Sequence, residues 1–521
     1  MRYSRVLLPS VLVLIAATSA PAQQRETTTV EVVQVPVYVT SAGASVRGLT
    51  RDNFALRVNG KPQQIDYFDV VDFAALSPDQ TRDPRQRRLY VLMFDLVNSS
   101  PFSVLRAKRA AESYVESAQP SDYFAVALLN RYNAIDFIVP FTKDKAALRW
   151  AVASFSPASP ADPLRLTVSQ AERAALINDD AGAIADLRRT GAGVAVELIA
   201  DLARSRTVDQ LDALGDLAQR MAPMEGYKHV VLLSDGFDNS LLLEGPRATT
   251  NIFRVGPAPQ LAAFRSPSQT PMFDSRLPLS QRIMQKKFAA AGVFLDAVDI
   301  AGLRPYDEPP NDSLHFIIAD TGGQVVEHRN DLTSAMQRLT DSQQVVYVLG
   351  FHAPQTGRKQ NAILVHVDGA PRWSALSYRE AYTSIADKPS TRDGLRLADI
   401  VINDVPQNGI SMTAAVVTAP RQATLNVVLP GRELLAIAGD DAKVTGEALM
   451  YVFSGQTAVA FARKGVDVDV ARARSDGIAE GNVDISQSFD LPPGKYAMKV
   501  LVRIEGHDTL AFARKDFTIG D

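Results

Sequence analysis

The sequence predicts an α/β domain with a doubly wound sheet, preceded by a small N-terminal β module and followed by a C-terminal β-sandwich. Between residues 88 and 385, short continuous apolar runs alternate with segments of helical periodicity. Strands that are buried on both faces and connected by helices produce this pattern. On either side of this region, apolar residues occur in short runs separated by Gly, Pro, Asn or Asp, which is typical of antiparallel sheets.

The composition excludes several classes of function. Hydrophobic residues make up 46% of the 521 residues and charged residues 22%, as in globular rather than disordered proteins. The 55 basic and 58 acidic side chains leave a formal charge of −3, so we expect no nucleic-acid partner. Because the chain has no Cys, disulfides, thiolate metal sites and Cys nucleophiles are excluded. Oxygen-bearing side chains are left as the candidates for site chemistry.

Residues 1–22 have the three parts of a secretory signal peptide. Arg2 and Arg5 give a positive start, Val6–Ala17 forms an apolar core, and Ala20-Pro21-Ala22 is a small-x-small cleavage pattern. The core is shorter than the membrane-spanning length of about 20 residues, and no later run approaches that length. We therefore expect an exported protein, periplasmic or secreted after cleavage near Ala22, with no transmembrane segment in the mature chain.

Residues 27–73 are predicted to form the N-terminal β module. Thr29–Thr40 alternates and is rich in Val, and Asn59-Gly60 is a strong hairpin signal. Residues 74–87, rich in Pro, Asp and Arg, are predicted to be a polar linker. The basic cluster at its end is expected in solvent and consists of Arg82, Arg85, Arg87 and Arg88.

The α/β domain is expected over residues 88–385. Its buried strands are predicted from three continuous apolar runs, Leu89–Phe94, His229–Leu233 and Val293–Asp299. Its helices are predicted over Val104–Ala118, Lys143–Ser154, Val194–Ala203, Leu279–Ala291 and Leu332–Leu339. Two later strands are assigned to the same domain, Val345–Phe351 and Ala362–Val367. Two stretches, near 157–192 and 241–278, do not fit the strands and helices of a minimal α/β domain and are predicted to be insertions.

Residues 392–521 are predicted to form a β-sandwich of immunoglobulin-like type. The basis is the regular spacing of short apolar runs between turn-forming residues. These runs are Ala423–Leu429, Glu447–Phe453, Thr457–Phe461, Val483–Phe489, Lys495–Val502 and Leu510–Ile519.

Carboxylates follow two of the buried strands of the α/β domain. Asp95 ends the first apolar run, and Asp235 follows the second. Ligands of open α/β sheets bind outside the carboxyl ends of the strands, and Mg²⁺ prefers carboxylate, hydroxyl and water oxygens. If the two strands are neighbours, Asp95, Ser99 and Asp235 form a candidate metal site. An open position on that metal would accept a carboxylate from a partner.

A series of short motifs runs in order along residues 29–385. The first are Gly48-Leu49-Thr50-Arg51-Asp52-Asn53-Phe54, Asn59-Gly60-Lys61-Pro62-Gln63, Val91-Leu92-Met93-Phe94-Asp95 and Val230-Val231-Leu232-Leu233-Ser234-Asp235-Gly236. The later ones are Thr321-Gly322-Gly323, Asn330-Asp331-Leu332, Tyr347-Val348-Leu349-Gly350-Phe351 and Tyr378-Arg379-Glu380-Ala381-Tyr382. In this order they resemble the bacterial von Willebrand factor A (VWFA)-related domain proteins of the acidobacterial type. The resemblance implies a Rossmann-like A domain that usually serves metal-dependent adhesion to proteins rather than catalysis.

The chain departs from the metal motif of this family, which is Asp-x-Ser-x-Ser with a separate Thr and a later Asp. Asp95, Ser99 and Asp235 match it, but Val97 replaces the first Ser. The Thr position falls near Gly191–Gly193, where an aligned Thr is missing. The resemblance therefore implies a degenerate adhesion site that binds Mg²⁺ or Ca²⁺ weakly. The alternative is that Asp95 and Asp235 only cap and orient loops.

Three functions are compatible with these features. The first is an exported, non-enzymatic protein that binds an unknown protein partner with the top face of its A domain. The second is a metal-dependent phosphohydrolase of haloacid-dehalogenase type with Asp95 as nucleophile. Such enzymes usually carry a general acid two residues later, and Val97 cannot transfer a proton. The third is a structural envelope protein without a ligand site.

Overall fold

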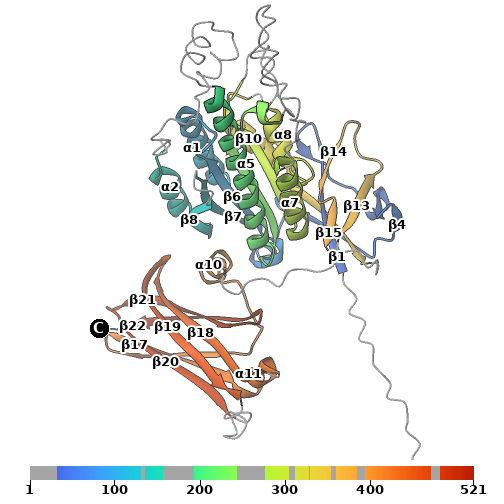
Figure 1. Ribbon diagram of the computed structural model, residues 1–521. Coiled ribbons are helices and arrows are strands. Elements are labelled where there is room, and N and C mark those ends of the chain that lie inside the picture. The colour runs from blue at the N-terminus through green and yellow to red at the C-terminus, as the bar shows by residue number, and fades with distance from the viewer. Residues whose placement is uncertain are drawn as a thin grey trace, which may run out of the picture.

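The computed structural model describes residues 32–130, 135–156, 193–242, 276–303, 311–327, 329–353, 360–383, 393–439, 441–470 and 481–520. For residues 193–202, 240 and 383 it describes the backbone alone. The predicted signal peptide 1–22 and the predicted insertion 157–192 lie outside these ranges, as do residues 243–275 of the other insertion. Figure 1 shows a helix-covered central sheet with a β region at one side and a β-sandwich below.

The central sheet has the strand order β11-β10-β9-β6-β7-β8. Its strands are β6 (Arg88–Asp95), β7 (Asp122–Leu129), β8 (Ile135–Thr142), β9 (Tyr227–Ser234), β10 (Val293–Asp299) and β11 (Val325–Val326). Neighbouring strands are parallel except for the β7–β8 pair, which is antiparallel. The protein is thus mixed α/β, and this sheet is compatible with the predicted Rossmann-like arrangement.

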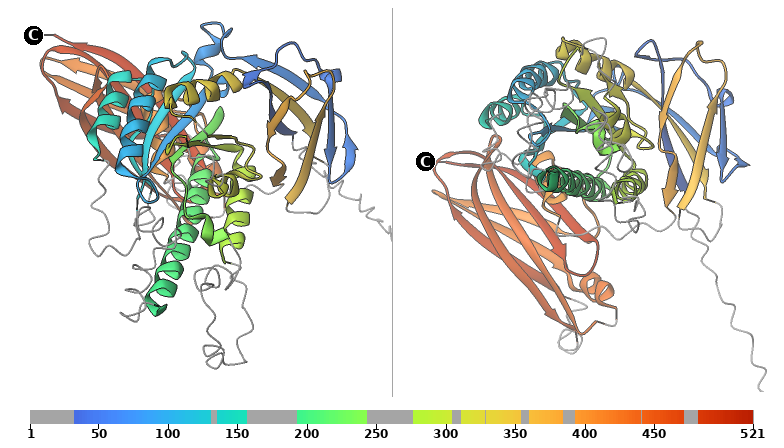
Figure 2. Two further views of the ribbon diagram at one scale, coloured as in Figure 1. Left: turned by 90° about the horizontal axis from the view of Figure 1, so that it is seen from above. Right: turned by 45° about the horizontal axis from the view of Figure 1, so that its top comes forward.

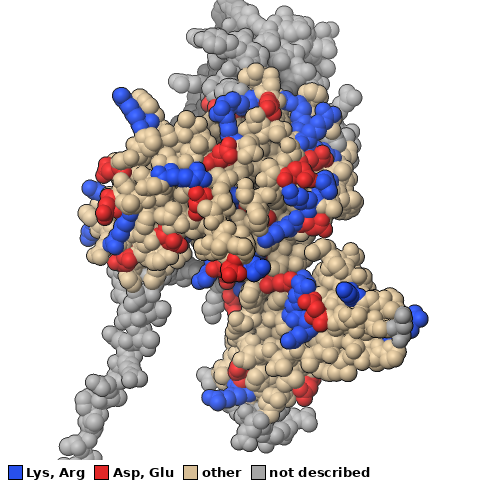
Figure 3. All heavy atoms as spheres, turned by 180° about the vertical axis from the view of Figure 1, so that it is seen from behind, with Lys and Arg blue, Asp and Glu red and all other residues tan. Residues whose placement is uncertain are grey.

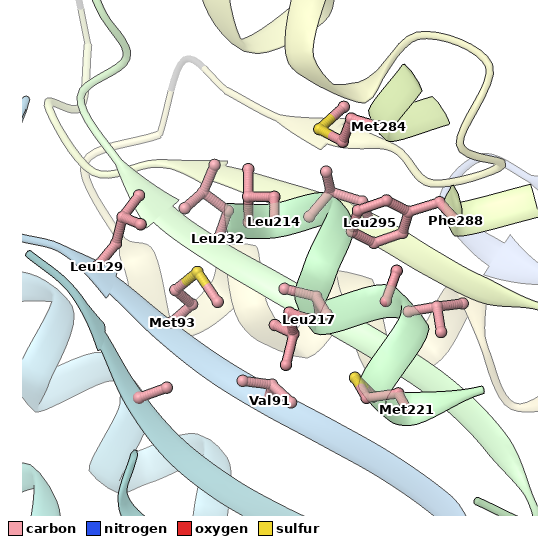
Figure 4. Packing of buried hydrophobic residues seen from close by; sticks show 14 of the residues in the cluster. Val91, Met93, Leu129, Leu214, Leu217, Met221, Leu232, Met284, Phe288 and Leu295 are labelled. Carbon is pink, nitrogen blue, oxygen red and sulfur yellow. The ribbon is translucent and has the colours of Figure 1, made fainter. Parts of the chain in front are cut away.

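Strand β6 shows why this sheet is covered on both faces. All of its residues are buried, and they alternate between two separate apolar clusters. Leu89, Val91 and Met93 belong to the first cluster, which contains side chains of α5 (Gly193–Met221) and α7 (Arg276–Ala291) (Figure 4). Residues 90, 92 and 94 belong to the second cluster, which contains side chains of α1 (Pro101–Glu116), α2 (Lys145–Ser154) and α9 (Leu332–Ser342).

The helices around the sheet differ from the predicted ranges at their ends: some are longer, whereas the helix predicted over Lys143–Ser154 is shorter. They are α1 (Pro101–Glu116), α2 (Lys145–Ser154), α5 (Gly193–Met221), α7 (Arg276–Ala291), α8 (Asp312–Ile318) and α9 (Leu332–Ser342). A short 3₁₀ turn, η4 (Asn239–Leu242), follows β9. The largest difference is in α5, where the predicted helix Val194–Ala203 is only the first part.

The N-terminal β region contains strands that the sequence analysis assigned to the α/β domain. One sheet has the order β14-β1-β12-β5, with β2 paired to β1, and the other has the order β15-β13-β3-β4. Both contribute to one apolar core. From the N-terminal segment come β1 (Val32–Ser41), β2 (Ala44–Ser45), β3 (Phe54–Val58), β4 (Lys61–Gln63) and β5 (Tyr67–Asp72). From beyond the central sheet come β12 (Val345–His352), β13 (Gln360–Val367), β14 (Ala375–Tyr378) and β15 (Ala381–Thr383).

Val345–Phe351 and Ala362–Val367, which the sequence analysis assigned to the α/β domain, therefore do not belong to its central sheet. Strand β12 pairs with β1 and β5, and β13 pairs with β3, all in antiparallel fashion. A continuous apolar run predicts a buried strand but not the sheet to which that strand belongs. The core of the N-terminal region is built from strands that precede the central sheet in the chain and from strands that follow it. The few short strands within residues 27–73 would be only marginally stable by themselves.

The C-terminal region consists of two antiparallel sheets that share one apolar core. One has the order β16-β17-β20, with β16 (Thr413–Ala419), β17 (Gln422–Pro430) and β20 (Asn482–Asp490). The other has the order β19-β18-β21-β22, with β18 (Lys443–Ser454), β19 (Thr457–Asp469), β21 (Gly494–Ile504) and β22 (Thr509–Ile519). The short helix α11 (Gly431–Ala438) follows β17. The two layers are visible in Figure 2.

Helix α10 (Gly394–Asn403) connects the central domain to this sandwich. Its Leu395 belongs to an apolar cluster of the central domain, whereas Ile400 and Val401 pack against the sandwich. Asp399 forms a bidentate ion pair with Arg87, at 2.9 and 2.6 Å. The predicted solvation of the basic cluster is thus wrong for Arg87 and Arg88, which are 2% and 0% exposed. Both have buried carboxylate partners.

The helices in the described part of the chain give no sign of a membrane-spanning segment, and the face shown in Figure 3 gives no sign of a one-sign charge patch. Among the described residues, no helix has the length and apolar character required to cross a bilayer. On the face shown in Figure 3, basic and acidic side chains are interspersed rather than separated into one-sign patches.

Candidate functional site

Asp95 and Asp235 lie at the carboxyl ends of neighbouring strands. Strands β6 and β9 are paired in parallel, from Arg88 opposite Tyr227 to Phe94 opposite Leu233. Asp95 is the last residue of β6, and Asp235 directly follows β9. The structure therefore brings the two predicted carboxylates to the same edge of the sheet.

Both carboxylate oxygens of Asp95 accept hydrogen bonds from the chain itself. Oδ1 accepts from the backbone N–H groups of Val97 and Asn98 at 2.9 and 3.0 Å, which shapes the loop after β6. Oδ2 accepts from the Asn98 side-chain amide at 3.0 Å and from the Ser234 hydroxyl at 2.6 Å. Asp95 is 2% exposed. It thus ties the loop after β6 to the end of β9.

Hydrogen bonds also connect the loop that contains Ser99 with the loop that contains Asp235. The Asp235 backbone N–H donates to the Ser99 hydroxyl oxygen at 3.1 Å. In return, Asp235 Oδ2 accepts from the Ser100 backbone N–H at 2.8 Å. Ser100 is the N-cap of α1, and its hydroxyl accepts from the Ser103 backbone N–H. The three predicted site residues therefore form one hydrogen-bonded junction between β6, β9 and the start of α1.

A further carboxylate and an asparagine lie beside Asp235. Asn311 donates from its side-chain amide to the Asp235 carbonyl oxygen at 2.9 Å and to Asp299 Oδ2 at 3.3 Å. Asp299 ends β10, the strand next to β9. Gly236 has a φ of +77°, and a Cβ there would lie 2.3 Å from the Ser313 hydroxyl oxygen. Only glycine therefore allows the Asn311 segment to approach this closely.

Sequence reasoning did not select Asn98, Ser234, Asp299 or Asn311 as site residues. A signal was present for Asp299, because it ends the third apolar run and the rule that selected Asp95 applies to it equally. Asn98 and Ser234 are adjacent to selected residues, but their pairing depends on the contact between two strands. Asn311 follows residues 304–310, which lie outside the described ranges, and carries no motif of its own.

The pKa of Asp235 is raised to about 6, chiefly by burial. Hydrogen bonds from the Ser100 backbone and the Ser103 side chain lower this pKa, and the charges of Asp299 and Asp95 contribute to the rise. Asp235 is 4% exposed, so its charged form is poorly solvated. Protonation of this carboxyl group therefore occurs in the weakly acidic range.

The residues present do not fit a strong metal centre. Asp95 already accepts hydrogen bonds at both oxygens, and Val97 offers no oxygen. The predicted Thr position, near Gly191–Gly193, has residues 190–192 outside the described ranges. Among the described residues, no group of three or more His, Asp or Glu side chains could hold a metal ion. A cation between Asp95 and Asp235 would have to displace donors that the fold supplies.

Comparisons with known proteins give only distant structural likenesses. No protein-family model and no curated protein matches the chain. The chain is similar to an aerotolerance-related membrane protein from Bacteroides fragilis, at 11% identity and a TM-score of 0.26, over 49% of this chain and 98% of that one. It is similar at the same identity and TM-score to BatB from Bacteroides thetaiotaomicron, over 50% and 99%. At these TM-scores the likeness does not place the chain in a family, so the proposals below depend on its own residues.

Proposed function

We propose that this chain is an exported, non-enzymatic protein-interaction protein of VWFA-related type. In this proposal it binds a protein partner with the loops at the carboxyl ends of β6, β9 and β10, without the help of a metal ion. The observation that carries the proposal is the hydrogen bonding of Asp95, whose two oxygens are both engaged by donors of the chain. Loops that are fixed in this way offer a preformed surface rather than a free nucleophile.

The attachment of the other two regions supports a role for this surface. Arg87, at the start of β6, holds α10, and His229, near the start of β9, contacts Tyr38 of the N-terminal region at 3.0 Å. Both contacts lie toward the amino ends of the parallel strands. The carboxyl ends of the same strands carry Asp95 and Asp235 and are free of these contacts in the described part of the chain. That edge is also where open α/β sheets bind their ligands.

Site-specific photo-crosslinking tests the proposal. A photoreactive amino acid is placed at Val97, in the loop after β6, and in a control chain at Leu364, which is 55% exposed on β13. Both full-length proteins are irradiated in extracts of the envelope fraction of the source cells, with and without EDTA. We expect one discrete protein adduct at position 97 that EDTA does not remove, and no such adduct at position 364.

Two outcomes would contradict the proposal. If position 97 gives no adduct, or the same adducts as position 364, the carboxyl-end loops are not a specific interaction surface. If the adduct forms only without EDTA, partner binding depends on a divalent cation, and the metal-independent part of the proposal is wrong.

A further inference from the structure

Helix α1 begins at the candidate site and presents an exposed stripe of side chains to one side of it. Phe102, Leu105 and Arg109 lie at helical spacings of three and four residues, so they share one face of the helix. Phe102 is 70% exposed and Leu105 is 40% exposed. The opposite face of α1 is buried in the core of the central domain. The exposed stripe is therefore not required for packing of the domain.

Arg106 joins this stripe to two neighbouring loops. Its guanidinium donates to the backbone carbonyls of Ala301 at 3.1 Å and Asn330 at 2.8 Å. It also lies 6.0 Å from the centre of the Phe102 ring. Leu303, which is 59% exposed, is held beside it by a hydrogen bond from its N–H to the Asn330 side chain at 3.0 Å. We call Phe102, Leu105, Arg106, Arg109 and Leu303 the α1 patch.

The charge of the α1 patch is positive. Arg106 gives its hydrogen bonds to carbonyl groups, which carry no net charge. No ion pair of Arg106 or Arg109 is found within the described residues. Three exposed apolar side chains thus lie beside two cations that form no ion pair in the described part of the protein. A rigid patch of this kind complements a ligand that combines apolar and acidic side chains.

We infer that the α1 patch binds a protein segment containing both apolar and acidic residues. The inference rests on the proposed function, because it specifies where at the carboxyl-end surface the partner lies and which chemistry it has. Phe102 and Leu303 contact the apolar side chains of the segment, and Arg109 pairs with its carboxylates. Arg106 keeps the loops in place, so the patch is already formed before the partner binds.

The test uses the full-length chain as the target for a phage-displayed library of short random peptides. Enriched peptides are synthesised with a fluorescent label and titrated against Phe102→Ser and Arg109→Glu. The matched controls are Leu364→Ser and Arg57→Glu, because these two residues are an exposed apolar and basic pair on neighbouring strands β13 and β3.

We expect enriched peptides that carry several Asp or Glu residues together with Leu, Phe or Trp. Their affinity should fall about tenfold or more in each α1 variant and stay within about twofold in each control variant. Enrichment of basic or purely polar peptides would overturn the inference. So would peptides whose affinity is unchanged by Phe102→Ser and Arg109→Glu.

A third variant, Val97→Arg, separates this inference from the proposed function. Peptides that lose affinity in Val97→Arg but not in the α1 variants would show that the partner surface lies on the carboxyl-end loops and not on the α1 patch. If no peptide is enriched, or if none responds to any of the three variants, both the inference and the proposed function are wrong.

Discussion

The Asn98 side-chain amide donates to Asp95 Oδ2 and to Gln210 Oε1, each at 3.0 Å. In an oxygen-rich metal site, a cation would bring such acceptors together. Here the neutral side-chain amide of Asn98 brings Asp95 and Gln210 together, and Asn98 belongs to the loop that these hydrogen bonds stabilise. These fixed donors hold the junction between β6 and β9 in place.

The raised pKa of Asp235 makes a prediction for stability against pH. Because its pKa in the folded chain is about 6 rather than 3.8, the folded state binds a proton more tightly than the unfolded state. The associated stabilisation is complete below pH about 3.8 and is lost as the pH rises through about 6. Above this range, burial of the charge costs on the order of 2–3 kcal/mol.

Asp235→Asn should therefore raise the free energy of unfolding at pH 8 and leave it nearly unchanged at pH 4. The amide oxygen can still accept from the Ser100 backbone N–H, as the carboxylate does at 2.8 Å. Denaturant unfolding at the two pH values measures the difference, and Asp52→Asn, at an exposed position, serves as the control. A variant that is less stable than the wild type at pH 8 would mean that the charge of Asp235 is stabilising.

The phosphohydrolase alternative depends on Asp95. A nucleophilic carboxylate needs an oxygen that can reach the phosphorus atom, but both oxygens of Asp95 accept hydrogen bonds from the chain. We expect no turnover of p-nitrophenyl phosphate above background with Mg²⁺. Hydrolysis that disappears in Asp95→Asn would establish the chain as an enzyme and overturn the interaction proposal.

At the scale of elements, α10 is the unexpected feature. The sequence analysis treated the chain after residue 392 as entirely β, yet Gly394–Asn403 is helical and contributes side chains to two cores. The segment is amphipathic, so its helical periodicity was visible in the sequence. Its start was visible too, because Asp393 is a favoured N-cap residue, and in the structure its side chain accepts from the Leu395 backbone N–H.

The ion pair between Arg87 and Asp399 connects the central domain to α10, and we expect its loss to lower the stability of the chain strongly. Both side chains are buried, at 2% and 3% exposure, so Asp399→Ala leaves a buried cation without its partner. We expect a loss of about 3–5 kcal/mol in the free energy of unfolding. The control is Asp79→Ala in the exposed pair with Arg82, at 95% and 77% exposure, where the loss should be less than about 1 kcal/mol. Similar losses in both variants would contradict this role.

The elements that the sequence predicted well are those whose pattern is local. The runs at β6, β9 and β10 and the periodicity of α1 and α9 all depend on the environment of one element. The sheet to which β12 belongs depends on β1, about 300 residues earlier in the chain. Likewise, the strand-end rule placed Asp95 and Asp235 together, but it could not predict that Asn98 and Ser234 would occupy the oxygens of Asp95.

At the scale of the molecule, the N-terminal region and α10 are attached toward the amino ends of the parallel strands. Two residues at the start of β6 take part in this attachment. Arg87 binds Asp399 of α10 at 2.6 Å, and the Arg88 guanidinium lies 4.5 Å from the centre of the Phe73 ring of the N-terminal region. The segment 74–87, which the sequence analysis expected to be an exposed linker, is therefore buried at its end. The carboxyl ends of the same strands carry no such attachment within the described residues.

Limited trypsin digestion of the native chain should reflect this arrangement. Cleavage is expected after Arg82 and Arg85, whose side chains are each 77% exposed, and not after Arg87 or Arg88. Mass spectrometry of the early fragments identifies the sites. In Asp399→Ala, cleavage after Arg87 should appear. Early cleavage after Arg87 in the wild type would mean that this connection is open in solution.

The central claim is that the junction of Asp95, Ser99 and Asp235 is held by hydrogen bonds of the chain and does not depend on a metal. Calorimetric titration of Mg²⁺ into the full-length protein tests it most directly. We expect no binding tighter than about millimolar, and the same weak heats in Asp235→Ala. Binding of micromolar affinity that is lost in Asp235→Ala would contradict the claim and would make the metal the centre of the site.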